Sequence, residues 1–212
     1  MKTVEMSNFD SVLFDVDETL VSTFEIHNLA FMKVLSEYSF VFNFKYELFS
    51  GMRTREVFEA INFPIELTNS AVLRKQEIAR TLMSNVRPMN GASNLLEFFV
   101  SHKKRIFSVS SGSRQNVLKS LASAELIHYI EDSIFSEDVT NGKPDPECYL
   151  LALERFNLNS NNTIAVEDST SGCQSAWDAG LRVVGISNTR ELKSTIQFPT
   201  LVDFQDKMSG VN

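Results

Sequence analysis

Cysteine is scarce in this chain, with only Cys148 and Cys173 among 212 residues. Two cysteines cannot build a disulfide framework or a cysteine-based metal site. Their scarcity fits a reducing compartment, and we expect both to be buried packing residues on helices.

Positive charge is in deficit, because 20 lysines and arginines face 27 aspartates and glutamates, for a net charge of −7. This balance argues against broad contact with nucleic acid or an anionic membrane. No apolar run approaches membrane-spanning length, and no apolar stretch of the signal-peptide kind follows Lys2. We therefore expect a cytoplasmic protein with no nucleic-acid or membrane partner, present as a monomer or weak homodimer.

The chain has ample material for a hydrophobic core. Hydrophobic residues make up 43% and include 17 phenylalanines, while charged residues make up 22%. These fractions are ordinary for a globular protein, and the length suffices for one large domain with a smaller one inserted.

Strand-like and helix-like segments alternate over most of the chain. Short apolar runs of β-prone residues predict strands, and the segments between them have helical spacing. The expected strands are 10–16, 106–109, 133–135, 163–166 and 182–186, and the expected helices are 92–102, 114–124, 146–156 and 171–179. This alternation predicts an α/β fold with a parallel sheet.

One long stretch breaks the alternation. Residues 21–87 have apolar residues at helical spacing without strand-like alternation, and a segment with proline and glycine, 87–92, ends them. We therefore expect two domains. Residues 1–20 and 88–212 form an α/β core domain, and residues 21–87 form an inserted helical cap domain.

Two aspartates, Asp15 and Asp17, lie at the end of the first expected strand. Burying unpaired carboxylates costs far too much for packing to explain them, so they must meet water, a cation or a substrate. Later segments also end on reactive groups, namely Ser110, Lys143 and the pair Glu167-Asp168. The carboxyl ends of parallel strands share one edge of the sheet, where open α/β sheets bind their ligands.

Carboxylates gathered at one edge repel each other unless a cation lies among them. Oxygen ligands without His or Cys select a hard ion such as Mg²⁺, which also accepts phosphate oxygens as ligands. Ser110 and Lys143 are suited to hold the other phosphate oxygens and to stabilise the charge of a phosphoryl-transfer transition state.

The same residues carry a family resemblance. Four motifs of the haloacid dehalogenase superfamily have counterparts here, in order and at similar spacing: Asp15-Val16-Asp17-Glu18-Thr19, the run ending at Ser110, Gly142-Lys143-Pro144 and Glu167-Asp168-Ser169. The chain resembles in particular the β-phosphoglucomutase-like group, over essentially its whole length. The resemblance implies a Rossmann-like parallel sheet core of the HAD-like kind with an inserted α-helical cap.

The resemblance also implies catalytic roles. Asp15 is then the nucleophile that forms an aspartyl-phosphate, and Asp17 is the general acid and base. Ser110 and Lys143 bind the transferring phosphoryl group. Glu18 departs from many relatives, which have glycine at this position.

A Mg²⁺ site follows from the same resemblance. Its implied ligands are Asp15, Asp168 and the main-chain carbonyl of Asp17. Glu167 either joins them, directly or through water, or pairs with Lys143.

Substrate selection is expected in the cap and beside the second motif. The candidate substrate-binding residues are His27, Arg53, Arg55, Lys75, Ser111 and Asn116. His27 either contacts substrate or is a hydrogen-bonded residue at the cap hinge. Arg53 and Arg55 either bind phosphate or flank a solvated helix start, and for Lys75 a plain surface charge is the preferred interpretation.

The leading functional hypothesis is a Mg²⁺-dependent phosphatase that acts on a small-molecule phosphate ester, a sugar or sugar-acid phosphate. The first alternative is a mutase of the β-phosphoglucomutase type, which the imperfect matches of the cap residues disfavour. A distant alternative is a non-catalytic phosphate-binding module. Asp17 favours phosphoryl transfer over dehalogenation, because dehalogenases of the superfamily generally lack an acid/base aspartate there.

Overall fold

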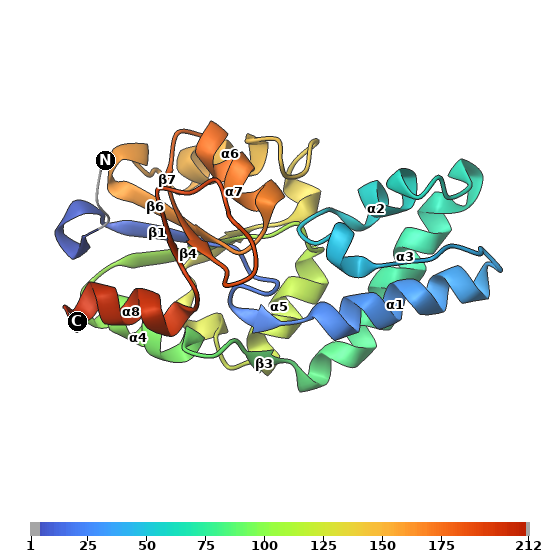
Figure 1. Ribbon diagram of the computed structural model, residues 1–212, viewed down its shortest axis with the longest axis horizontal. Coiled ribbons are helices and arrows are strands. Elements are labelled where there is room, and N and C mark those ends of the chain that lie inside the picture. Colours follow the sequence, from blue (N-terminus) through green and yellow to red (C-terminus); the bar gives the residue numbers. More distant parts are fainter. Residues whose placement is uncertain (1–4, 211–212) are drawn as a thin grey trace.

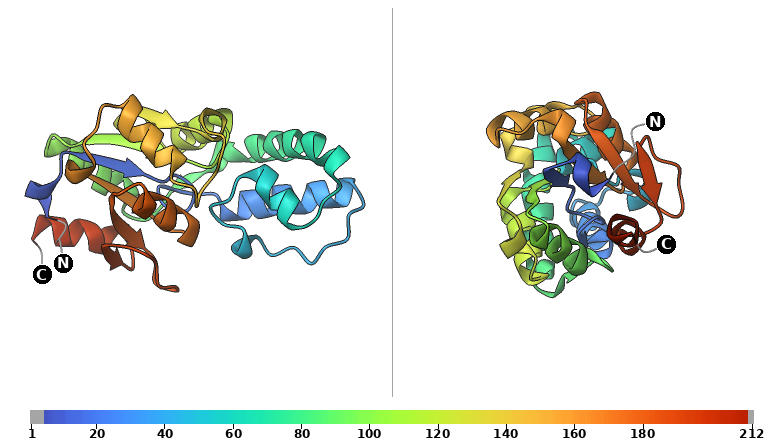
Figure 2. Two further views of the ribbon diagram at one scale, coloured as in Figure 1. Left: turned by 90° about the horizontal axis from the view of Figure 1, so that it is seen from above. Right: turned by 90° about the vertical axis from the view of Figure 1, so that its left-hand side faces the viewer.

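A computed structural model of the protein describes residues 5–210. A twisted sheet with helices on both faces occupies one end of the molecule, and a group of helices occupies the other (Figures 1 and 2). The first four and last two residues of the expected core domain lie outside the described residues.

Six parallel strands form the sheet, in the order β5-β4-β1-β6-β7-β8. They are β1 (Ser11–Phe14), β4 (Arg105–Val109), β5 (Asp132–Ile134), β6 (Thr163–Glu167), β7 (Arg182–Ile186) and β8 (Ile196–Phe198). The chain runs outward from β1 in one direction through β4 and β5, and in the other through β6, β7 and β8. The carboxyl end of β1 is therefore the point where an open α/β sheet forms a ligand-binding crevice.

Five helices accompany the sheet: α4 (Ala92–Ser101), α5 (Arg114–Ser123), α6 (Glu147–Arg155), α7 (Thr170–Asp178) and α8 (Leu201–Ser209). α4 and α8 lie on one face, and α6 and α7 lie on the other (Figure 1). Along β1, Val12 and Phe14 belong to one buried cluster and Leu13 to a second. Because both faces are covered, the strand is apolar from Val12 to Phe14 without alternation.

The second group of helices comes from the segment between β1 and α4. It contains α1 (Phe24–Glu37), α2 (Thr54–Ala60) and α3 (Ile65–Leu82). Two short strands, β2 (Val21–Ser22) and β3 (Arg87–Pro88), pair antiparallel, so the chain leaves and returns at one place. This pairing lies at the expected boundaries near residues 20 and 88, although the division into two domains stays a prediction.

Short 3₁₀ turns connect the elements: η1 (Met6–Asn8), η2 (Tyr46–Leu48), η3 (Met83–Asn85), η4 (Ile127–Tyr129), η5 (Ser136–Asp138) and η6 (Ser160–Asn162). Aromatic rings fill the helical group, where Phe31 lies 5.1 Å from Phe44 and 5.4 Å from Phe58 between ring centroids. These rings and the apolar side chains of one sheet face form a continuous buried cluster.

The structure confirms the predicted α/β class, and each expected strand and helix has a counterpart. β8 and α8 were not predicted, because residues 196–209 mix polar and apolar positions without a clear period. Among residues 5–210, no helix is long and apolar enough to cross a membrane.

Phe99 of α4 offers a direct test of the core. It is fully buried, and its ring contacts those of Phe9, Phe14 and Phe204. Phe99→Ala should lower the free energy of unfolding by about 3–5 kcal/mol, because it removes buried area and leaves a cavity. The matched control Val100→Ala, at a neighbouring position that is 49% exposed, should cost less than about 1 kcal/mol. Equilibrium urea unfolding measures both, and equal losses would contradict this account.

Candidate active site

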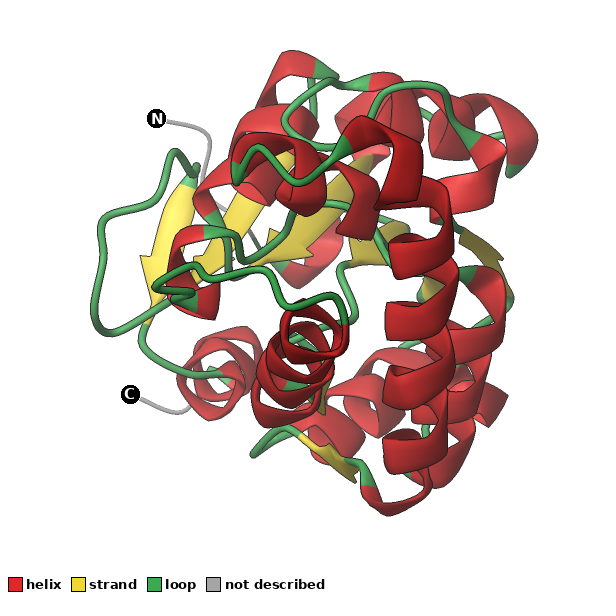
Figure 3. Cartoon of the chain, turned by 90° about the vertical axis from the view of Figure 1, so that its right-hand side faces the viewer, coloured by secondary structure: helices red, strands yellow, loops and turns green. Residues whose placement is uncertain are grey.

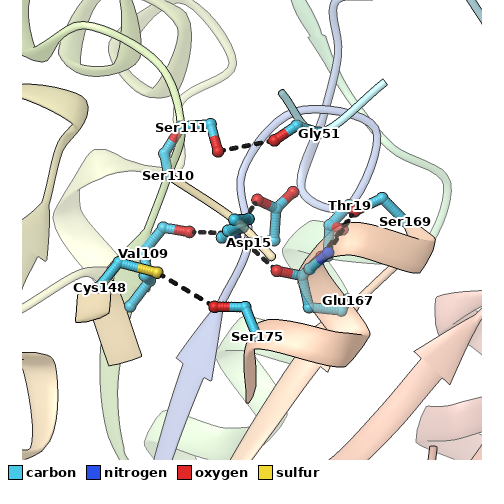
Figure 4. A network of polar contacts seen from close by, with 12 residues as sticks. Asp15, Thr19, Gly51, Val109, Ser110, Ser111, Cys148, Glu167, Ser169 and Ser175 are labelled. Carbon is cyan, nitrogen blue, oxygen red and sulfur yellow. Dashed lines mark hydrogen bonds and ion pairs between the residues drawn. The ribbon is translucent and has the colours of Figure 1, made fainter. Parts of the chain in front are cut away.

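Three neighbouring strands bring the predicted residues to one place (Figure 4). Asp15 follows β1, Ser110 follows β4, and Glu167 ends β6. Phe14 of β1 is in register with Ser108 of β4 and Val166 of β6, so the three strand ends are level. The helical group lies in front of these ends (Figure 3).

Lys143 enters this group from the loop before α6. Its Nζ donates to Asp15 Oδ1 at 2.8 Å, to Glu167 Oε1 at 2.6 Å and to the Val109 carbonyl at 2.9 Å. Burial opposes the charged form of Lys143, but Asp15 and Glu167 outweigh burial and raise its pKa well above the ordinary value. Lys143 is therefore a permanent, fully coordinated cation at the centre of the site.

The carboxylates around Lys143 outnumber it. Asp15, Glu167 and Asp168 each place an oxygen within 4.8 Å of the other two. Burial raises the pKa of Asp15. Lys143 lowers this pKa, but Glu167 and Asp168 raise it further, and the net shift is upward. Burial and then Glu167 raise the pKa of Asp168 to about 7. One lysine does not balance three carboxylates, and this all-oxygen donor set fits a hard divalent cation such as Mg²⁺.

The Glu167 side chain is fully buried and held by its neighbours. Its Oε1 accepts a hydrogen bond from the hydroxyl of Tyr149 at 2.6 Å in addition to the one from Lys143. Gly172 packs directly on the carboxylate, since a Cβ there would lie 2.0 Å from Glu167 Oε2. The structure shows the pairing with Lys143, and a role for Glu167 as a ligand of the cation stays a prediction.

Sequence reasoning missed Tyr149. This residue lies on the first turn of α6 and is fully buried. In the sequence it is indistinguishable from an ordinary aromatic core residue, because only the folded chain places its hydroxyl on Glu167.

The Asp17 carboxylate lies apart from the three clustered carboxylates. Its Oδ1 accepts hydrogen bonds from Thr23 Oγ1 at 2.7 Å and from His27 Nε2 at 3.2 Å. Burial alone would raise the pKa of Asp17, but these hydrogen bonds and the nearby cationic groups lower it to about 2. Asp17 thus remains ionised in this arrangement, and 27% of its side chain is accessible.

His27 is in turn held by Lys75. Lys75 Nζ donates to His27 Nδ1 at 2.7 Å, which leaves His27 Nε2 to donate to Asp17. Burial lowers the pKa of Lys75 to about 7, and burial together with Lys75 lowers the pKa of His27. The preferred interpretation of Lys75 as a surface charge is wrong, because only 3% of the residue is exposed. α1 and α3 therefore supply a connected pair of side chains to Asp17.

Two other candidates join the helical group to the sheet. Ser111 Oγ donates to the Gly51 carbonyl at 2.8 Å, and Asn116 Nδ2 donates to the Gln76 carbonyl at 3.1 Å. Asn116 Oδ1 has no hydrogen-bond partner among the described residues. Gly51 has φ +85°, and a Cβ there would lie 2.5 Å from Ser171 Oγ. Only glycine fits this close approach of the helical group to the sheet.

The two cap arginines are engaged elsewhere. Arg53 pairs with Glu56 at 2.7 Å and donates to the Val139 carbonyl at 3.3 Å. Arg55 is exposed and donates to Asn69. They flank the first residue of α2, which is the alternative that the sequence left open, and their role in substrate binding stays a prediction.

A cavity of about 330 Å³ reaches Asp168 from outside. Most of the residues that line it are polar. They come from the loop after β1, the helical group and the segments after β3, β7 and β8: Glu18, Thr19, Phe24, Glu47, Ser50, Met89, Asn90, Ile186, Ser187, Asn188, Thr189, Arg190, Pro199, Thr200 and Leu201. A larger cavity of about 1080 Å³ between α3 and α5 contains none of the four-motif residues. The smaller cavity is the one that reaches a member of the carboxylate cluster, Asp168.

The lowered pKa of Lys75 predicts that the free energy of unfolding depends on pH. Its pKa is about 7 in the folded state and close to 10.4 in an unfolded chain. The unfolded state therefore binds more protons between these values, and the penalty for burying Lys75 fades as pH rises. Lys75→Met should be more stable than the wild type near pH 7.5, and the difference should shrink toward pH 9.5 by at most about 1.4 kcal/mol per pH unit. Urea unfolding at both pH values measures the difference in free energy of unfolding. Lys33→Met, at an exposed position of α1, is the matched control. A difference independent of pH would contradict the assignment.

Comparison with known proteins identifies a family and relatives of similar sequence. The family model for haloacid dehalogenase-like hydrolases matches residues 12–186. A 6-phosphogluconate phosphatase of Escherichia coli is 29% identical over 185 residues, covering 84% of this chain and 82% of that protein. A phosphorylated carbohydrates phosphatase of Thermotoga maritima is 30% identical over 183 residues, covering 84% of this chain and 85% of that protein.

The fold also matches solved structures. The structure of CbbY from Rhodobacter sphaeroides in complex with phosphate has a TM-score of 0.83, with 22% identity, and covers 92% of this chain and 96% of that one. The predicted HAD-like fold and the predicted class of enzyme, a phosphatase, are confirmed by these comparisons. The chain belongs to the haloacid dehalogenase-like hydrolase family.

Proposed function

We propose that the protein is a Mg²⁺-dependent phosphatase for small phosphorylated carbohydrates, sugar or sugar-acid phosphates, that acts through an aspartyl-phosphate. The observation that carries this proposal is the separation of two aspartates: Asp15 lies with Asp168 and Lys143, and Asp17 is held apart by Thr23 and His27. The names of the two phosphatases similar to this chain support the substrate class.

The first step transfers the phosphoryl group to Asp15. A carboxylate oxygen of Asp15 attacks phosphorus, the ester P–O bond breaks, and Asp17 gives its proton to the leaving oxygen. Lys143 stabilises the charge on the phosphoryl oxygens. Ser110 assists, because its Oγ accepts from the Gly112 amide at 2.9 Å and so keeps its own proton for the phosphoryl group.

The second step releases phosphate. Asp17 takes a proton from water, the water oxygen attacks phosphorus, and the bond to Asp15 breaks, which yields inorganic phosphate and restores both aspartates. Mg²⁺, held by Asp15, Asp168 and the main-chain carbonyl of Asp17, would supply positive charge to the phosphoryl oxygens. Glu167 Oε1 accepts from Lys143 and Tyr149, and its other oxygen, Oε2, would join the ligands directly or through water.

The two roles of Asp17 need opposite protonation states. Its pKa of about 2 leaves it ionised at neutral pH, ready to accept a proton from water. A phosphate dianion beside Asp17 opposes the ionised form and raises this pKa, which is the direction that proton donation to the leaving group requires.

Mutase activity is the second candidate. The relatives include a β-phosphoglucomutase of Bacillus subtilis, which is less similar to this chain than the two phosphatases. The pairing of Arg53 with Glu56 leaves that arginine engaged rather than directed to a second phosphate, which favours hydrolysis. Conversion of β-glucose 1-phosphate to glucose 6-phosphate with a bisphosphate primer would establish the mutase instead.

The cytoplasmic setting and the monomeric or weakly dimeric state stay predictions.

A panel of phosphorylated metabolites tests the proposed function. With Mg²⁺, the purified protein should release inorganic phosphate from at least one sugar or sugar-acid phosphate, and EDTA should stop the release until Mg²⁺ is restored. EDTA should leave the far-UV circular dichroism unchanged, since the cation site lies at strand ends rather than in the core. No release from the panel or from an aryl phosphate would refute the proposal.

Asp15→Asn tests the nucleophile. The amide cannot form the aspartyl-phosphate, so kcat should fall by about 10³-fold or more. The matched control is Asp10→Asn, an exposed aspartate at the opposite end of β1, which should retain full activity. Unchanged circular dichroism in both variants separates lost chemistry from lost folding, and an active Asp15→Asn variant would refute the assignment.

A further inference from the structure

Glu18 occupies an unusual backbone conformation beside Asp17. Its φ is +62°, in the left-handed region that non-glycine residues adopt rarely and at a cost of about 1 kcal/mol or more. Glycine would adopt it without this cost. The presence of a side chain here therefore calls for an interaction that offsets the strain.

The Glu18 carboxylate supplies that interaction at the start of α1. Its Oε1 accepts from the Thr23 amide at 2.6 Å and from the Phe24 amide at 2.7 Å. Thr23 is the N-cap of α1 and Phe24 its first residue. The first amides of a helix lack partners within the helix and carry the positive end of its dipole, so an anion is favourable there. Glu18 thus caps a 14-residue helix from outside that helix.

The Thr23 side chain makes a contact outside the helix. A threonine at the N-cap commonly accepts a hydrogen bond from the second or third helical amide. In the described chain the Thr23 side chain makes no such bond, and Oγ1 donates to Asp17 Oδ1 instead. His27 lies four residues later on the same face of α1 and donates to the same oxygen. The first turn of α1 therefore directs two donors at Asp17.

We propose that Glu18 is a positioning residue for the general acid and base Asp17. By accepting from the Thr23 and Phe24 amides, it fixes the first turn of α1 so that Thr23 and His27 hold the Asp17 carboxylate in its working orientation. The inference rests on the proposed function, in which Asp17 protonates the leaving group, and it ties the loop after β1 to the helical group.

Three substitutions separate this role from simple stability. Glu18→Gly removes the acceptor and suits the left-handed backbone, and Glu18→Asn also tolerates that backbone but is one methylene shorter. Glu18→Gln keeps an oxygen acceptor at full length. Glu25→Gln is the charge control, because Glu25 lies in the same first turn and is exposed.

Hydrogen exchange followed by NMR tests the cap. In Glu18→Gly the Thr23 and Phe24 amides should exchange about tenfold faster or more than in the wild type, because their acceptor is lost. Glu18→Gln and Glu25→Gln should preserve their protection. Unchanged exchange in both Glu18→Gly and Glu18→Asn would overturn the capping role whether or not the protein is active.

The nature of the leaving group tests the effect on Asp17. An alkoxide leaving group needs a proton from Asp17, whereas nitrophenolate departs without one. Glu18→Gly should therefore lower kcat on a sugar phosphate by about tenfold or more and on p-nitrophenyl phosphate by less than about threefold, with similar KM values. Glu18→Gln should stay within about twofold of the wild type on both esters.

Equal losses on the two esters, or a loss in Glu18→Gln as large as in Glu18→Gly, would overturn the inference. A wild-type protein that hydrolyses neither ester would instead refute the proposed function. In that case the exchange measurement still decides whether Glu18 caps α1.

Discussion

The site depends on the contacts of one buried cation, Lys143, with Asp15 and Glu167. Charges removed from water are tolerated only when their partners are well placed, and loss of one partner leaves an uncompensated charge. The level ends of β1, β4 and β6 supply the partners, and Tyr149 and Gly172 hold Glu167 against the lysine. With Glu167 paired in this way, the remaining negative charge lies on Asp15 and Asp168, where an added cation is most favourable.

The pKa values of Asp15 and Asp17, which are separated by one residue, are shifted in opposite directions by their surroundings. Burial among carboxylates raises the pKa of Asp15, while donors from α1 lower that of Asp17 despite burial. Pairs of titratable groups whose pKa values are driven apart are typical of a division of labour between catalytic residues. The donors to Asp17 come from the start of the helical group, so this group sets the charge state of Asp17 as well as covering the strand ends.

The four motifs predicted the centre of the site, because each reactive residue follows a strand and parallel strand ends share an edge. Tyr149 could not be predicted, since its role depends on where α6 packs. Lys75 is a different case. Ala71, Lys75, Ile78 and Ala79 are buried along one face of α3, and this helical spacing was present in the sequence. The pairing of Arg53 with Glu56 follows an i,i+3 spacing that is present in the sequence. The contact of Arg55 with Asn69 could not be predicted, because it depends on how α2 packs against α3.

Lys75 connects the packing of the helical group to the state of Asp17. Its Nζ lies 4.5 Å from the centre of the Phe31 ring and contacts His27, and Asp17 is the acid that favours its charged form. An ionised Asp17 therefore reduces the free-energy cost of burying the lysine, and a charged lysine in turn favours ionised Asp17. Such coupling is reciprocal. Protonation of Asp17 weakens the attraction that offsets the burial of Lys75, so the protonation state of Asp17 affects the energy that holds α1 and α3 together.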